Sequence, residues 1–323
     1  MRNMFLRNAL AAIVCLAGAM PAWAQTYPVK AIRVIVPFAP GGGTDILTRV
    51  IAPKMSELLR HQIIVDNRPG AGSQIGTDLV VKAPPDGYTV LMVDTAFTTN
   101  PSLYSKLPYD SIKDLVPVSL SASAPVILIV HPSVPAKTVK ELVALARSHP
   151  GALNFASGGS GSSTHLGVEL LKYVAKVNLV HIPYKGTGPA VADVLGGQVT
   201  MMFAGISSVK QHVEAGRLRA IAVTGDKRSP AMPSVPTFIE AGLKGVDAST
   251  YWGALAPAKT PADVVNKLSA TIAQLLRMPE VSQKLIDLGF EPIGGTPEQY
   301  GQVIASEIDK WSKVIKAANI RLD

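Results

Sequence analysis

Short apolar runs alternate with segments of helical periodicity along most of the chain, and this alternation constrains the fold most strongly. The runs are rich in Val and Ile, as strands covered on both faces are. The predicted strands are Ile32 to Pro37, Ile63 to Val65, Thr89 to Val93, Val126 to Val130, Leu179 to Ile182, Val199 to Phe203 and Ala220 to Val223. Predicted helices between them include Asp45 to Leu59, Val139 to Ser148, His165 to Val174, Val191 to Leu195 and Val209 to Ala215. This βαβ rhythm predicts an α/β protein with mainly parallel sheets covered by helices on both faces.

The C-terminal third is predicted to be mostly helical. Helices are expected to start near Thr260 and at Pro279, and a last one runs from Thr296 to about Ala317, because capping residues and prolines mark first turns. Two apolar segments, 116–130 and 250–256, lack helix starts, and we interpret them as strands that cross between two domains. The first domain would comprise residues 25–125 and 250–323, and the second residues 126–249.

The first residues have the pattern of a secretory signal peptide. Arg2 and Arg7 are followed by the apolar run Ala9 to Met20 and by the small-x-small sequence Ala22-Trp23-Ala24. We therefore predict that residues 1–24 are removed by cleavage after Ala24 and that the chain is exported. In a bacterium the destination would be the periplasm.

Composition argues against several function classes. The one cysteine, Cys15, lies in the predicted signal peptide, so the mature chain would have no disulfide and no cysteine metal ligand. The net charge of +8 suits an anionic small ligand or an anionic membrane surface. Lys and Arg occur singly and aromatic residues make up 6%, so a nucleic-acid stripe is not expected. No two histidines are three or four residues apart, and we predict no metal site and no cofactor.

Two glycine-rich turns each lead from an extended segment into a helix. They are "VPFAPGGGTDIL" at residues 36–47 and "NFASGGSGSSTHLGVELL" at residues 154–171. The first amides of a helix have no internal acceptor and attract anions, and glycine lets an anion approach them. Each turn alone could be a plain strand-to-helix connection, but two of them across a cleft could hold both ends of a dianion. Neither matches a dinucleotide fingerprint, a P-loop or a complete nucleophile elbow.

Several other side chains have open interpretations. Asp45 would repel a bare anion, so it is expected to complement the helix dipole or bind nearby amides, or less readily to meet an amino group on a ligand. His165 could pack, contact the ligand or, as a minority alternative, act as the base of a serine hydrolase. Tyr251 and Trp252 could line a hinge or fill the interdomain core, and Trp311 is expected to pack.

Specific segments resemble one family over essentially the whole mature chain. They include "NRPGAG", "NPSLYSKLPYD", "HIPYKGTGPAVADVLGGQV" and "YWGALAPAKTPADVVNKL". These segments are similar to those of the substrate-binding receptors of tripartite tricarboxylate transporters, the Bug family. The resemblance implies a type II periplasmic-binding-protein fold, in which two doubly wound α/β domains joined by two crossover strands close around a small carboxylate.

The resemblance also implies how the protein works. It would be a monomeric binding protein without catalytic residues that delivers its ligand to a two-component membrane permease. A receptor that presents its closed form to a sensor kinase is an alternative, and a secreted serine hydrolase is a more distant one.

The expected site combines the two turns with nearby strand ends. The first turn, Phe38 to Thr44, would hold the carboxylate through backbone and water, and the second, Ser157 to Thr164, would supply amide and hydroxyl donors. The loop 94–98 would close the same side. Many relatives carry Asp at position 204, so Ala204 favours a plain mono- or dicarboxylate over an amino acid. The predicted ligand-binding residues are Phe38, Ala39, Gly42, Gly43, Thr44, Thr95, Ser157, Gly161, Ser162, Ser163, Thr164, Tyr184 and Ala204.

Overall fold

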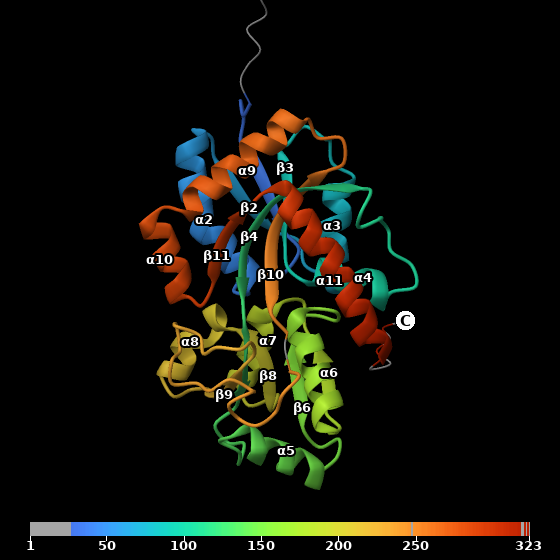
Figure 1. The fold of residues 1–323 in the computed structure, drawn as a ribbon, viewed down its shortest axis with the longest axis vertical. Helices are drawn as coiled ribbons and strands as arrows, with labels where there is room; N and C mark the ends of the chain where they lie inside the picture. The colour runs from blue at the N-terminus through green and yellow to red at the C-terminus, as the bar shows by residue number, and fades with distance from the viewer. Residues whose placement is uncertain (1–26, 247, 318–319, 321, 323) are drawn as a thin grey trace, which may run out of the picture.

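The strands of the protein form two separate sheets. The computed structural model describes residues 27–246, 248–317, 320 and 322. A six-stranded sheet and a five-stranded sheet occupy the upper and lower halves of Figure 1. The predicted signal peptide, with Cys15 and the cleavage position after Ala24, lies outside the described residues. The α/β class predicted from the alternating pattern is confirmed.

The first sheet has the strand order β11-β4-β10-β3-β1-β2. Its strands are β1 (Ile32–Val36), β2 (Ile63–Asn67), β3 (Thr89–Val93), β4 (Leu115–Ala124), β10 (Thr250–Pro257) and β11 (Glu291–Gly295). β1 is parallel to β2 and β3, with Ile35 opposite Leu91. The carboxyl ends of β1 and β3 therefore meet at one edge, which brings the first glycine turn close to the loop after β3.

The second sheet has the order β7-β6-β8-β5-β9. Its strands are β5 (Val126–Val130), β6 (Asn154–Ser157), β7 (Val180–Pro183), β8 (Met201–Gly205) and β9 (Arg219–Val223). β6 is parallel to both β7 and β8. The second glycine turn, the loop after β7 and the end of β8 consequently share one edge, as ligand-binding loops of open α/β sheets do.

Two strand segments run between the sheets. β4 and β5 are separated only by Pro125, and Thr250 at the start of β10 pairs with Ala124 at the end of β4. These segments coincide with the predicted crossovers. The expectation of mainly parallel sheets is wrong, because five of the nine strand pairings are antiparallel. β10 and β11 run against the direction of the other four strands in the first sheet, and β5 runs against the other four in the second.

Helices cover the sheets and follow most of the predicted boundaries. They are α2 (Gly43–Leu59), α3 (Gln74–Val81), α4 (Ala96–Leu103), α5 (Val139–Ser148), α6 (Ser163–Ala175), α7 (Thr187–Leu195), α8 (Ile206–Glu214), α9 (Ala262–Leu276), α10 (Pro279–Asp287) and α11 (Pro297–Ala317). α7 begins four residues before the predicted start at Val191. Gly188 and Pro189 read as a turn, yet proline fits the first helical turn because the amide it lacks would have no acceptor there.

β11 is absent from the sequence-based prediction. Its sequence, Glu-Pro-Ile-Gly-Gly, has no apolar run and lies in the third of the chain predicted to be mostly helical. It becomes a strand by pairing with β4, whose Leu120 lies opposite Gly295. Tertiary pairing rather than local pattern forms this edge strand.

The C-terminal helix α11 packs against the cores of both halves. Tyr300 and Ile304 belong to the same apolar cluster as Leu255 of the first sheet. Trp311 is fully buried and belongs to the cluster that contains Phe203 of the second sheet. Figure 1 shows α11 running from the upper half toward the lower half. The predicted packing role of Trp311 is confirmed.

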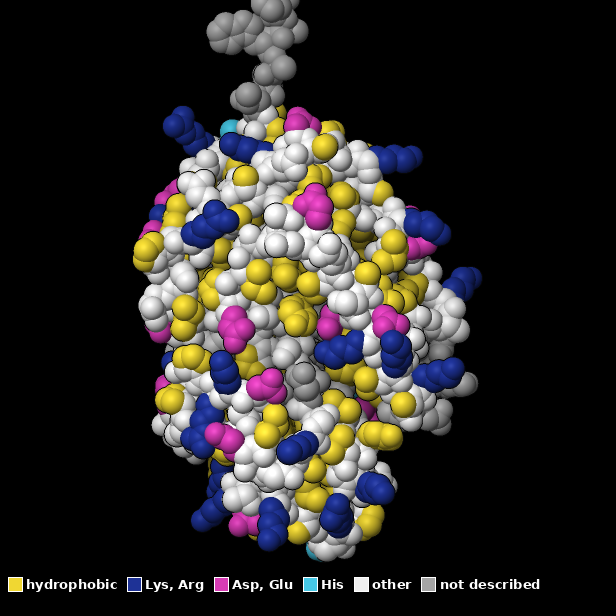
Figure 2. Space-filling view, in the orientation of Figure 1, with side chains coloured by type: hydrophobic (Ala, Val, Ile, Leu, Met, Phe, Trp, Pro, Cys, Tyr) yellow, Lys and Arg dark blue, Asp and Glu magenta, His cyan; other side chains and the backbone are white. Residues whose placement is uncertain are grey.

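The surface carries mixed charge. Figure 2 shows Lys and Arg side chains spread over this face, with Asp and Glu among them. Among the described residues, no helix is both long and apolar enough to span a membrane.

Candidate functional site

The first glycine turn leaves the first amides of α2 without a side-chain cap. Gly42 occupies the N-cap position, and no side chain caps the helix there. Asp45 accepts a hydrogen bond from the Gly41 amide at 3.0 Å and pairs with Arg49 at 2.9 Å. Its carboxylate therefore binds a local amide, one of the two roles expected from the sequence. The uncapped amides at the start of α2 are donors available to an anion.

Gly43 lets an aromatic side chain lie against the first turn. A Cβ atom at this position would lie 2.9 Å from Cζ2 of Trp252, which is closer than real Cβ contacts. The indole Nε1–H of Trp252 donates to Thr44 Oγ1 at 3.0 Å. Trp252 thus holds the start of α2 in place from β10.

Hydroxyl groups of the second turn hold its own backbone. Ser162 is the N-cap of α6, and its Oγ donates to the Gly159 carbonyl at 2.7 Å. Thr164 Oγ1 accepts from the Gly158 amide at 2.9 Å. These bonds fix the shape of the turn, so the amides at the start of α6 are presented at fixed positions.

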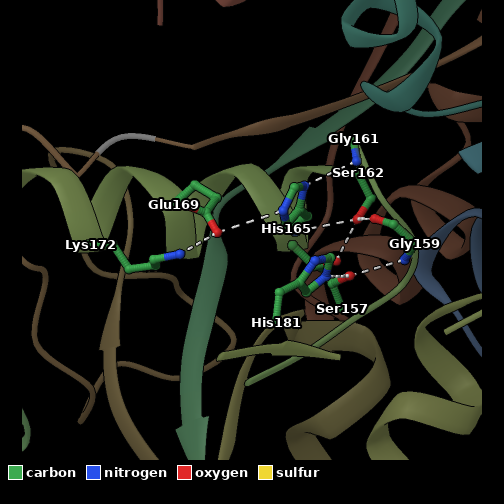
Figure 3. Close-up of polar contacts among 9 residues, drawn as sticks. Ser157, Gly159, Gly161, Ser162, His165, Glu169, Lys172 and His181 are labelled. Carbon is green, nitrogen blue, oxygen red and sulfur yellow. Dashed lines mark hydrogen bonds and ion pairs between the residues drawn. The ribbon is translucent and has the colours of Figure 1, made fainter. Parts of the chain in front are cut away.

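A buried pair of stacked histidines lies beneath the second turn (Figure 3). The rings of His165 and His181 are 4.0 Å apart between centroids and nearly parallel, at 17°. His165 Nδ1 accepts a hydrogen bond from the Gly161 amide at 3.1 Å, and His181 Nε2 is 2.7 Å from Ser157 Oγ. Both rings therefore support the backbone of the turn from below.

Burial keeps both histidines neutral. It lowers the pKa of His165 well below its ordinary value, with the second ring and Lys172 acting in the same direction. Burial, with a smaller contribution from Lys172, lowers the pKa of His181 to about 4. Because Nδ1 of His165 accepts the Gly161 amide, its proton is on Nε2, which lies 3.8 Å from Glu169 Oε1. The ring of His165 thus supports a backbone amide through Nδ1 and lies near Glu169 through Nε2.

Both turns line one narrow cavity between the sheets. Its volume is about 20 Å³, close to the minimum that one water molecule needs. Asp94 is the one ionisable side chain among the described residues that line it. The full lining is Phe38, Gly42, Gly43, Thr44, Asp94, Gly158, Ser162, Ser163, Thr164, Thr187, Gly205, Thr250 and Trp252. Seven of the predicted ligand residues are thus brought together: Phe38, Gly42, Gly43, Thr44, Ser162, Ser163 and Thr164.

Four predicted residues lie outside the wall of this cavity and have structural partners instead. Ser157 is fully buried against the histidine pair, and Gly161 is buried beneath α4. Thr95 is buried and accepts the Tyr251 amide. Ala204 is fully buried in an apolar core cluster, and the next residue of β8 lines the cavity in its place.

The remaining two predicted residues, Ala39 and Tyr184, lie where the halves of the molecule touch. The Ala39 amide donates to the Lys185 carbonyl at 2.9 Å, which ties the first turn to the loop after β7. Tyr184 lines a second cavity of about 210 Å³, which also includes Phe38 and Gly158 in its wall. The Tyr184 hydroxyl donates to Asp193 at 2.5 Å, and partial burial raises its pKa to about 12.

The structure represents a closed arrangement. Besides the bond from Ala39, Thr99 Oγ1 donates to the Gly161 carbonyl, and Lys210 Nζ donates to the Asp287 carbonyl at 2.8 Å. A Cβ atom on Gly188 would lie 2.1 Å from the Pro40 carbonyl oxygen. The first turn is therefore in direct contact with the loop after β7 and with α7, and the second turn is in direct contact with α4.

The predicted ligand residues do not include the cavity residues that are adjacent to strands rather than within glycine turns, although the loop 94–98 expected to close this side contains Asp94. Asp94 directly follows an apolar strand, and Thr187 begins α7 shortly after β7. Thr250 begins β10, and its Oγ1 donates to Ser163 Oγ at 2.6 Å. A polar residue at the carboxyl end of a buried strand is the signal that could have identified Asp94. For Trp252 the sequence left hinge lining and core filling open. The structure buries it in the apolar core of the first sheet, and it also forms part of the cavity wall.

The described residues include no group of three or more His, Cys, Asp or Glu side chains placed to hold a metal ion. The donors of the cavity are backbone amides and hydroxyls, together with the indole that is bonded to Thr44. This set suits a small oxygen-rich anion better than a cation.

Comparisons with known proteins agree with this geometry. Residues 47–320 match the tripartite tricarboxylate transporter family receptor. Protein BugT of Bordetella pertussis is 36% identical over 306 residues, which cover 94% of each chain.

Two solved structures from Rhodopseudomonas palustris are also similar. One, solved with adipate, has 35% identity and a TM-score of 0.89 and covers 92% of this chain and 100% of its own. The other, MatC with bound malate, has 34% identity and a TM-score of 0.86 and covers 90% of this chain and 100% of its own. The chain therefore belongs to the tripartite tricarboxylate transporter receptors, the Bug family of periplasmic binding proteins.

Proposed function

We propose that this protein binds a small organic mono- or dicarboxylate in the cavity between its sheets and delivers it to a tripartite tricarboxylate-type membrane permease. The observation that carries the proposal is the convergence of two helix N-termini, those of α2 and α6, on one cavity. Both present backbone amides, the groups that bind carboxylates at helix starts. The relatives solved with adipate and malate support a ligand of this class.

Binding would work by closure of two domains. We propose that residues 25–125 with 250–323 form one domain and residues 126–249 the other, hinged where β4 continues into β5 and where β10 begins. The two halves touch around the turns in the closed form, so a ligand that bridges both turns adds contacts available only on closure. It therefore shifts the population toward that form. The permease would recognise the closed surface of a monomeric receptor, exported by the predicted signal peptide.

The proposal is tested by native mass spectrometry of the purified mature chain and a thermal-shift screen. The panel contains mono-, di- and tricarboxylates, aromatic acids and amino acids. We expect a carboxylate to co-purify or to raise the melting temperature, since a ligand at a hundred times its Kd stabilises a protein by about 2.7 kcal/mol. Stabilisation by amino acids alone would reject the proposed ligand class. No response to any compound would reject the binding function.

A further inference from the structure

Asp94 is a carboxyl group in the wall of a cavity proposed to bind carboxylates. Its Oδ1 accepts the Ala96 amide at 2.9 Å, and its Oδ2 is 3.3 Å from Thr44 Oγ1. Thr44 Oγ1 also accepts the indole proton of Trp252, so its own proton is directed to Asp94. Asp94 is thereby held at the cavity, next to the start of α2.

No positive charge compensates this carboxyl group. Among the described residues, no Lys, Arg or His nitrogen lies within ion-pair distance of Asp94. The groups that act on it from neighbouring elements are the Thr44 hydroxyl of α2, the Ala96 amide of α4 and the buried phenol of Tyr300 in α11. Burial raises the pKa of Tyr300, so this phenol is neutral. An ionised Asp94 therefore depends on hydrogen bonds from the Ala96 amide, the Thr44 hydroxyl and its own amide, with no cation beside it.

A dianionic ligand would meet a like charge in this cavity. Two carboxylates within a few ångströms of each other cannot both remain ionised cheaply, and one of them takes up a proton. Burial already raises the pKa of Asp94 to about 6 in the closed structure, against the lowering effect of its hydrogen bonds. A protonated Asp94 would turn an acceptor into a donor directed at the ligand, which adds to the donors of the two helix starts.

We propose that Asp94 is a specificity-determining residue that takes up one proton from solution when a dicarboxylate binds and donates it in a hydrogen bond to a ligand carboxylate. The inference rests on the proposed function. Proton uptake by Asp94 would make the affinity for a dianion dependent on pH. A ligand that offers an ammonium group to this position would instead keep Asp94 ionised and would bind less tightly as the pH falls.

The test is isothermal titration calorimetry with adipate as the probe, between pH 6.5 and 8.5, where both adipate carboxylates are ionised. We expect Kd to rise at least tenfold over this range, because each pH unit above the pKa of free Asp94 makes the proton harder to supply. Titrations at pH 7.5 in buffers of different ionisation enthalpy should give an uptake approaching one proton per adipate.

Matched variants separate the role of Asp94 from a general effect of charge. Asp94→Asn keeps an acceptor for the Ala96 amide and removes the titration, so its Kd should change less than twofold over the same range. Asp309→Asn makes the same chemical change at an exposed position on α11, where the carboxylate pairs with Lys313, and should retain the wild-type pH dependence. The melting temperature of each variant confirms that it is folded.

The outcomes distinguish the two proposals. Adipate binding with a Kd independent of pH, or with no proton uptake, overturns the role of Asp94 and leaves the binding function intact. Tighter binding at higher pH also overturns it, because Asp94 would then act as an ionised acceptor. If neither wild type nor Asp94→Asn binds any acid of the panel at any pH, the proposed function fails and proton uptake fails with it.

Discussion

At the scale of single residues, the buried histidine pair links the second turn to pH. His165 and His181 are neutral in the folded protein, and one accepts a turn amide. Their pKa values are lower in the folded state than in the unfolded chain. As the pH falls below about 6.5, the unfolded state takes up protons first, so the free energy of unfolding decreases toward pH 4.

We predict that His181→Gln reduces this loss of stability. Between pH 7.5 and 5, the free energy of unfolding of wild type should fall by about 1 to 2 kcal/mol more than that of the variant. The reason is that the variant has no imidazole at position 181 to protonate on unfolding. Urea unfolding at the two pH values measures the difference. The comparison with the variant is needed because Asp94, whose pKa is raised, contributes with the opposite sign in this range. Equal losses in both proteins would show that His181 does not titrate as described.

At the scale of elements, the N-cap of α6 joins helix stability to the shape of the ligand turn. Ser162 caps α6 and also bonds the Gly159 carbonyl within the turn. Thr138 caps α5 through the Glu141 amide. Ser162 lines the cavity, whereas Thr138 lies outside its wall. The two caps are therefore similar in chemistry but differ in their relation to the site.

We predict that Ser162→Ala and Thr138→Ala each lower the free energy of unfolding by about 1 kcal/mol, as loss of an N-cap does. Only Ser162→Ala should also weaken adipate binding, because the turn loses the hydroxyl that fixes its backbone. Urea unfolding and calorimetry measure the two effects. Equal affinities in the two variants would mean that the turn holds its shape without Ser162.

The contact between α7 and the first turn offers a second test at this scale. We predict that Gly188→Ala raises the Kd for adipate at least tenfold, because its Cβ would lie 2.1 Å from the Pro40 carbonyl oxygen in the closed form. Gly196→Ala, at the other end of α7, meets its nearest atom at 3.5 Å and should bind normally. An unchanged Kd for Gly188→Ala would show that ligand binding does not require this closure.

At the scale of the whole molecule, α11 connects the two halves through its packing. Its first turns belong to the cluster of the first sheet, and Trp311 belongs to the cluster of the second. The Trp311 indole donates to Glu307 at 2.8 Å, and this hydrogen bond gives the buried carboxylate a partner. The sheets are also joined by β4, β5 and β10. We therefore expect the protein to unfold as one cooperative unit.

We predict that Trp311→Ala lowers the free energy of unfolding by about 3–5 kcal/mol, the range for deletion of a buried aromatic side chain. Tyr173→Ala removes an aromatic ring that is 59% exposed on α6 and should cost less than about 1 kcal/mol. Urea unfolding followed by fluorescence and circular dichroism gives both values. Two separated transitions in wild type would contradict the coupling of the halves by α11.

The sequence by itself determined the elements whose signals are local. Apolar runs placed nearly all strands within two residues, because a buried strand needs apolar residues whatever its neighbours are. Glycine turns ahead of helices predicted that the starts of α2 and α6 lie at a binding cavity, because such a turn is a local pattern, and residues 42–44 and 162–164 do line one cavity. The family segments supplied the closing two-domain fold.

Only the tertiary structure decided which side chains meet across the cleft. β11 became a strand by pairing with β4, and the crossing strands made the sheets mixed, because pairing partners far apart in sequence leave no local pattern. The predicted Ala204 is covered by the core, whereas Asp94 reaches the cavity because parallel β1 and β3 end side by side. A carboxyl group has no fixed role in a sequence. Only packing buries Asp94 without a cation beside it, and this burial is the basis of the proton uptake that we propose.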